Sequence, residues 1–181
     1  MAAQTFTTKY YRQPAVFAAN FPGIIERSVT LDLDTLIGPD GTDATPLEAA
    51  DILKLFKLPQ GAKLLYGVIE SEDLDTSTGI TLDLGVTDGT TTKLFFDEAT
   101  IAQAGGRADS RDAGATGALD AFDSNAASGY VITNGNFYVY LSCGTAASGT
   151  FQNDGIRVTI GYSLALEVDE GNRDWPSPIP S

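Results

Sequence analysis

The sequence predicts an all-β fold: an antiparallel β-sandwich, jelly-roll-like, with one or two short helices and extended terminal arms. Several stretches alternate apolar and polar residues, which is the pattern of half-buried strands. Turn sequences separate them, in a chain with 19 glycines. Helical patterns are confined to short pieces, which favours two packed sheets. We divide the 181 residues into an N-terminal arm (1–22), a sandwich body (23–169) and a Pro-rich C-terminal arm (170–181).

The first strand of the body is predicted at residues 24–33. Ile25, Val29 and Leu31 fall on one face of this stretch, and polar residues fall on the other. Arg27 is the only break in the alternation, because it shares the phase of the apolar residues. We therefore expect a strand with one buried face.

A helical turn and two strands are expected next. Residues 45–48 (TPLE) read as a capping box with proline at the first helical position. A strand is expected over 52–58, and residues 59–61 (PQG) mark a tight turn after it. Residues 63–71 carry apolar side chains in both phases, as in a strand covered on both sides.

A hairpin and a short helix follow. Residues 80–86 alternate, and Asp88-Gly89 supplies the positive φ angles of a type I′ turn before a strand at 93–96. Residues 97–104 (DEATIAQA) predict a short helix, acidic in its first turn and closed by two glycines.

Residues 105–129 are small, polar and glycine-rich, and predict a surface loop in which only 118–122 (ALDAF) packs. A second hairpin is predicted from 130–133 through Asn134-Gly135 to 136–143. Cys143 falls on its apolar face and is expected to be a small buried hydrophobe. The last strand, over 156–168, is long and cleanly alternating.

The two ends differ from the body. Residues 6–22 contain four aromatic residues without sustained periodicity, and the alternate prolines of 175–180 (WPSPIP) exclude both a helix and a β-ladder. Such arms either dock on a neighbouring surface or fold back over their own sandwich. On the first interpretation, the predicted intersubunit contacts are Tyr10, Tyr11, Arg12, Trp175, Pro176 and Ile179.

Charge and residue inventory exclude several functions. The formal net charge of −13 removes the usual driving force for binding nucleic acid or an anionic membrane. With no histidine and one cysteine, the chain has no His-based triad, Cys–His dyad or internal disulfide. Phosphate-binding loops, nucleophile elbows, a signal peptide and a membrane span have no support in the sequence. We expect no enzymatic activity and no cofactor.

One acidic cluster has the composition of a cation site. Glu70, Glu72, Asp73 and Asp75 supply the oxygen ligands that Ca²⁺ takes, but the glycine after them comes one position too late for an EF-hand and the closing glutamate is missing. A solvated acidic turn explains the cluster better, so no metal site is predicted.

The order of four segments resembles a known family: DILKLFKLPQGAKLLYGVIESEDLD, GITLDLGV, KLFFDEATIAQAGG and a final ASGTF…GIRVTIGYSLAL. In this order the chain, over about residues 50–168, is similar to the small structural proteins of tailed bacteriophages, which include head decoration (cement) proteins. The resemblance implies a virion component with no catalytic residue. It would assemble in the host cytoplasm, bind the major capsid protein on the outer capsid surface and bridge capsomers, often as a trimer.

Two other functions remain open. Tyr138 and Tyr140 lie in the polar phase of their strand, as exposed aromatic rings of a carbohydrate- or receptor-binding sandwich in a head fibre or tail would. Packing against a second sheet or a sister subunit is the other interpretation of these tyrosines. A hydrolase with paired carboxylates is the third possibility, but the abundance of acidic residues weakens it, because solvation in turns and on the polar phase of strands explains most of them.

Overall fold

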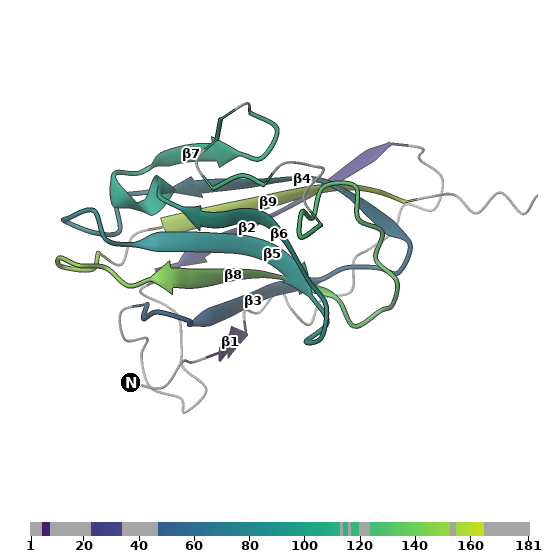
Figure 1. Ribbon diagram of the computed structural model, residues 1–181, viewed down its shortest axis with the longest axis horizontal. Helices are drawn as coiled ribbons and strands as arrows, with labels where there is room; N and C mark the ends of the chain where they lie inside the picture. Colours follow the sequence, from purple (N-terminus) through teal and green to yellow (C-terminus); the bar gives the residue numbers. More distant parts are fainter. Residues whose placement is uncertain are drawn as a thin grey trace, which may run out of the picture.

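The computed structural model describes residues 23–33, 47–112, 114–115, 117–119, 124–152 and 155–164, and the backbone of residues 5–7. Two stacked β-sheets form the body (Figure 1). One sheet has the order β1-β3-β8-β5-β6 and the other β2-β9-β4-β7. The strands are β1 Thr5–Thr7, β2 Ile24–Asp32, β3 Ile52–Lys57, β4 Ala62–Ser71, β5 Thr81–Thr87, β6 Thr92–Ala99, β7 Gly106–Asp109, β8 Tyr138–Thr145 and β9 Gly155–Leu164.

The strands pair in a nested series. Antiparallel pairs join β2 to β9, β3 to β8, β4 to β7 and β5 to β6, so the first strand of the body meets the last and the middle strands form a hairpin. When the four nested pairs roll up, one strand of each pair lies beside a strand of another pair, and β2 to β9 form two four-stranded sheets. This is the jelly-roll arrangement. The predicted fold class is confirmed, and β1 is an additional strand parallel to the edge strand β3.

The core lies between the two sheets. Alternate residues of β8 and β9 point into it, and Phe137, Val139, Leu141 and Cys143 are all buried as predicted. The sheets approach closely at Gly67, where a Cβ atom would lie 2.8 Å from the Phe95 ring. This close contact leaves no room for a side chain at that position.

A β-bulge in β4 decides which side chains reach the surface. The register against β9 shifts between Leu64 and Tyr66, so Leu64 packs in the core whereas Tyr66 lies on the outer face. Both residues are buried, Leu64 in the core and Tyr66 on the outer face, where the Arg111 guanidinium lies over its ring. The extra residue thus turns a tyrosine outward in the middle of the sheet.

The predicted helical turn at 45–48 is not formed in its described part. Residues 45–46 lie outside the described residues. After Glu48 the chain makes a turn in which the Asp51 N–H donates to the Glu48 carbonyl (3.0 Å), and Ala50 has a φ of 70°. This left-handed residue ends any helical path, and β3 begins at Ile52 as predicted.

The helix predicted over 97–104 is wrong in its first half. β6 continues to Ala99, and a single 3₁₀ turn, η3 (Ile101–Gln103), follows. Glu98 has a φ of 56° and its N–H donates to Asp83 on β5 (2.8 Å). Pairing with β5 therefore outweighs the helical propensity of the segment.

The hairpin predicted over 130–143 is also wrong. Val131 bridges Lys63 of β4, and the Ile132 N–H donates to the Ala62 carbonyl (2.8 Å), so residues 130–133 follow the other sheet. β8 already has β3 and β5 as neighbours, so it has no free edge for a hairpin partner. Asn134-Gly135 is instead the crossing between the sheets.

Two further differences concern loops. The β5–β6 hairpin is confirmed, but four residues separate the paired Thr87 and Thr92, and only Gly89 of the predicted type I′ pair has positive φ. The predicted surface loop over 105–129 begins with β7, and Ala118 and Ala126 bridge residues of β6.

The described residues include no helix that is long and apolar enough to cross a membrane.

Candidate functional site

The outer face of the four-stranded sheet carries a connected group of charged side chains. We call it the arginine face; it comprises Glu26 on β2, Tyr66 and Glu70 on β4, Arg107 and Asp109 on β7, Arg111 just after β7, and Arg157 on β9. Every strand of that sheet contributes to it.

Asp109 is the centre of the arginine face. Its carboxylate is buried and accepts hydrogen bonds from Arg111 Nε (2.8 Å), Arg111 Nη2 (2.5 Å) and Arg107 Nη2 (2.6 Å). The bonds from Arg111, together with that from Arg107, outweigh burial and lower the pKa of Asp109 to about 2. The ionised carboxylate therefore holds two guanidinium groups in place at neutral pH.

Tyr66 connects Asp109's partners to β2. The Arg111 guanidinium lies 3.7 Å from the centre of the Tyr66 ring, and the Tyr66 hydroxyl donates a hydrogen bond to Glu26 Oε1. Burial, with help from the Glu26 carboxylate, raises the pKa of Tyr66. The phenol thus stays protonated and fixes the arginine above it.

Glu70 completes the arginine face. Its carboxylate lies 3.8 Å from Arg107 Nε and 3.5 Å from Arg157 Nη1. About half of each of the three arginine side chains is exposed, and they border a shallow depression of about 180 Å³. Exposed pairs of this kind add little stability, so they order the guanidinium groups without contributing much to the fold.

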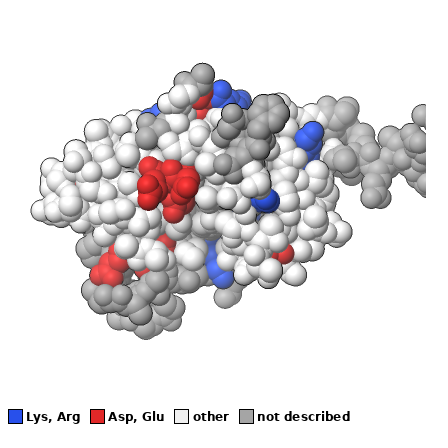
Figure 2. Space-filling model, viewed as in Figure 1, with Lys and Arg blue, Asp and Glu red and all other residues white. Residues whose placement is uncertain are grey.

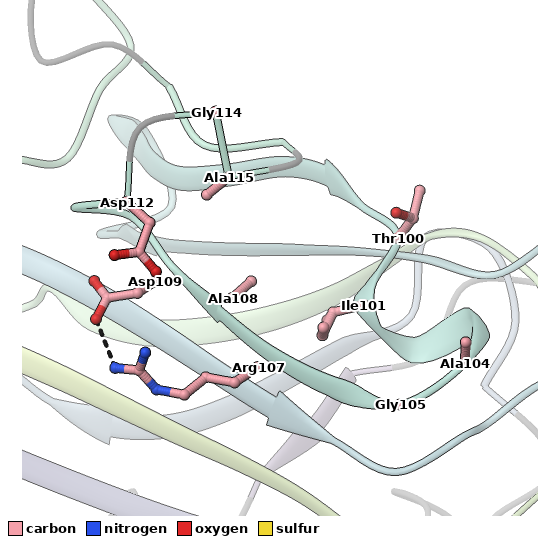
Figure 3. Close-up of a pocket in the computed structure, with 10 residues that line it drawn as sticks. All are labelled: Thr100, Ile101, Ala104, Gly105, Arg107, Ala108, Asp109, Asp112, Gly114 and Ala115. Carbon is pink, nitrogen blue, oxygen red and sulfur yellow. Dashed lines mark hydrogen bonds and ion pairs between the residues drawn. The ribbon is translucent and has the colours of Figure 1, made fainter.

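A second hollow lies on the other side of β7. It measures about 400 Å³ and is bordered by η3, β7 and residues 112, 114 and 115. Ala108, Arg107 and Asp109 are among the residues that line it, and Figure 3 shows the Arg107 and Asp109 side chains pointing toward one another. No group of three His, Cys, Asp or Glu side chains that could hold a metal ion occurs in the described part of the chain.

The five-stranded sheet carries a groove of about 520 Å³ on its outer face, which we call the tyrosine groove. Tyr138, Tyr140, Asp83 and Ser142 line it, with threonines from the β5–β6 hairpin. Ser142 Oγ donates to Asp83 (3.3 Å), and Lys54 lies 4.8 Å from the Tyr138 ring centre. Burial, with the charge of Asp83 next, raises the pKa of Tyr140. The two tyrosines predicted from the sequence therefore share one groove.

Acidic side chains gather on the same face, over β5 and β6 (Figure 2). Asp83 on β5 lies beside Glu98 on β6 and accepts a hydrogen bond from its backbone N–H. The charge of Asp97 also contributes to the raised pKa of Tyr140. The outer face of the four-stranded sheet thus carries arginines paired with carboxylates, whereas acidic side chains gather over β5 and β6 on the other outer face.

The acidic cluster at 70–75 is dispersed by the fold. Glu70 belongs to the arginine face, whereas Asp75 is buried. Burial raises the pKa of Asp75, but the hydrogen bonds that it accepts outweigh this effect and keep the pKa well below its usual value. The donors are the backbone N–H groups of Ser77, Gly79, Ile80, Ser148 and Gly149. Asp75 therefore ties two loops together.

The lone cysteine is buried, as predicted. Cys143 is 1% exposed, and burial raises the pKa of its thiol to about 12.

Arg27 also faces inward, as its phase in β2 indicates, and its guanidinium lies 4.4 Å from the centre of the Phe56 ring. Stacking on an aromatic ring explains how the alternation of β2 tolerates this residue.

The predicted contact residues Tyr10, Tyr11, Arg12, Trp175, Pro176 and Ile179 all lie outside the described residues. The arginine face was not predicted from the sequence. Its signal is the spacing of Arg107, Asp109 and Arg111, which places alternating charges on one face of a strand. The small residues between them made the segment resemble a loop.

Comparison with known proteins rests on structure. No protein-family model matches the chain, and no curated protein sequence matches it significantly. The fold is similar to a chain from the capsid of Ralstonia phage GP4, with a TM-score of 0.63 and 16% identity over 88% of this chain and 97% of that one. A chain from the capsid of cyanophage Pam1 gives a TM-score of 0.51 and 26% identity over 84% and 93%. Both neighbours are phage capsid proteins.

Proposed function

We propose that this protein is a structural component of a phage virion, which binds the outer surface of the capsid and stabilises it by bridging capsomers. The observation that carries the proposal is the jelly-roll fold shared with a chain from the capsid of Ralstonia phage GP4, along nearly the whole of both chains. The likeness to the cyanophage Pam1 capsid chain supports it independently.

The described surfaces suit such a role. A sandwich that carries arginines paired with carboxylates on one face and acidic side chains on the other offers polar contacts on two sides. Many identical weak contacts on a repetitive shell add up through effective concentration, so no single tight site is required. In this proposal the major capsid protein is the partner, copies of the chain associate as trimers, and the protein transforms no molecule.

The terminal arms are proposed to make the intersubunit contacts, with Tyr10, Tyr11 and Arg12 in the first arm and Trp175, Pro176 and Ile179 in the second. The test compares the full chain with variants that lack residues 1–22 or 170–181. Capsid occupancy, measured by cosedimentation and immunogold electron microscopy, is expected to fall in each variant while circular dichroism of the body stays unchanged. Full occupancy by both truncated chains would contradict the role of the arms, and absence of the full chain from virions would contradict the proposal itself.

A second candidate function is binding of a carbohydrate or cell-surface receptor, and the tyrosine groove is the observation that favours it. An aromatic ring, a carboxylate and hydroxyl groups are the side chains that hold a sugar, and Tyr138, Asp83 and Ser142 bring them together. A glycan array tests it. Binding that is lost in Tyr138→Ala and kept in Tyr138→Phe supports a sugar site, whereas an array without any bound glycan dismisses it.

A further inference from the structure

β1 differs from every other described strand in how it is held. Thr5–Thr7 pairs in parallel with β3, with Thr5 opposite Ile52, Phe6 opposite Leu53 and Thr7 opposite Lys54. All other ladders of the described sheets are antiparallel and belong to the jelly roll itself. β1 is therefore an added strand on a sheet that is already complete.

The edge of β3 acts as an acceptor for an extended segment. β8 occupies one side of β3 and β1 occupies the other, at the lower border of the sheet in Figure 1. An uncovered edge presents unpaired N–H and C=O groups, and adding a strand satisfies them whichever copy of the chain supplies it. The structure shows that the segment at 5–7 fits this edge in a defined register.

The pairing itself is short. Three residues in a parallel ladder provide few hydrogen bonds, and parallel pairs are less stable per residue than antiparallel ones. A ladder of this length holds the strand only weakly, so the local concentration of acceptor edges decides where it binds.

The connection to the body is long enough to reach a neighbour. Sixteen residues, 8–23, separate Thr7 from Ile24 at the start of β2. Fully extended, they span roughly 50 Å, several times the spacing of about 10 Å between packed sheets. Exchange of an identical element between copies needs no new contact and is a low-cost route to association.

We propose that β1 of one copy pairs with the β3 edge of a second copy, so that neighbouring copies are linked by strand exchange. The inference rests on the proposed function, in which copies lie side by side, and it assigns the acceptor for the N-terminal arm: the outer edge of Ile52–Lys54 in another copy of this chain.

Engineered disulfides test the exchange. Thr7→Cys in one full-length chain and Lys54→Cys in a second, differently tagged chain are co-expressed, purified together and oxidised. Because Cys143 is 1% exposed with a raised thiol pKa, it does not compete. The expected product is a covalent heterodimer in which peptide mapping joins position 7 of one chain to position 54 of the other. The doubly substituted single chain is expected to form covalent species larger than one copy.

Lys57→Cys, at the far end of β3 and outside the register with β1, is the matched control and should not cross-link with Thr7→Cys. Thr5→Cys with Ile52→Cys repeats the test at the other end of the ladder. Only intrachain disulfides in the doubly substituted chain, or no disulfide with either pair, would overturn the proposal. Capsid occupancy by the unsubstituted chain, measured in parallel, separates this failure from a failure of the proposed function.

Discussion

The ring of Tyr66 occupies the space that a side chain at position 161 would need. A Cβ atom built on Gly161 would overlap the Tyr66 ring carbons, and the Arg111 guanidinium lies 3.7 Å from the centre of the same ring. β9 thus carries a glycine where the outer face of β4 carries a tyrosine, and the bulge at Leu64–Tyr66 brings the two together. The arginine face depends on this pairing of a glycine with a large aromatic residue.

Gly161→Ala is expected to destabilise the fold by about 1–3 kcal/mol, because the Tyr66 ring must move and its contacts with Arg111 and Glu26 are lost. Urea denaturation measures the change. Gly155→Ala on the same strand is the control: its Cβ would meet only Leu31 O at 3.7 Å, so the effect should stay within about 0.5 kcal/mol. Equal losses in the two variants would contradict the packing argument.

The Cys143 thiol is expected to be inert in the native protein. Its pKa of about 12 and its burial keep it protonated and shielded at neutral pH. A chromogenic disulfide reagent at pH 8 should titrate one thiol per chain in denaturant and react with it only slowly without denaturant. Fast reaction of the folded protein would show that the end of β8 opens readily.

Acid should weaken the arginine face in a defined window. The pKa of Asp109 is lowered to about 2, so its ionisation stabilises the fold above the unfolded-state value near 4, and this contribution is lost as the pH falls toward 2. We expect a loss of about 1–2 kcal/mol over that range, measured as the free energy of unfolding. In Asp109→Asn this part of the pH dependence should disappear. Asp112→Asn, in the exposed turn nearby, should keep it.

Removing the Asp75 carboxylate should loosen two loops together. In Asp75→Ala the amides of Ser77, Gly79, Ser148 and Gly149 lose their acceptor. Hydrogen exchange at these amides should accelerate by about tenfold or more, since each donor is left without a partner. The exposed Glu72→Ala variant should leave them unchanged. Acceleration in only one of the two loops would show that Asp75 does not couple them.

The strands of the body were predictable because alternation reports burial directly. β2, β5, β8 and β9 each keep one apolar face against the core, and the sequence shows it. Alternation does not indicate which strands pair with one another in a sheet. Residues 130–133 and 136–143 therefore resembled a hairpin, whereas the nested topology places them on different sheets.

Most of the described site was not predictable, because it depends on residues that only the fold brings together. Tyr66 and Gly161 meet through a bulge, and Asp75 meets Ser148 across 73 positions. The helix expected at 97–104 failed for a similar reason, since pairing of β6 with β5 outweighs local propensity. The arm residues at both ends stay a prediction.

The pairing of Ile24 with Ser163 has a consequence for how the protein is made. Among the described strands β2 pairs only with β9, so this edge of the sheet cannot form until β9 has left the ribosome. Contacts this distant in sequence make folding slow, and the unpaired strands are exposed to aggregation in the meantime. We expect nascent chains that end before β9 to be recognised by chaperones.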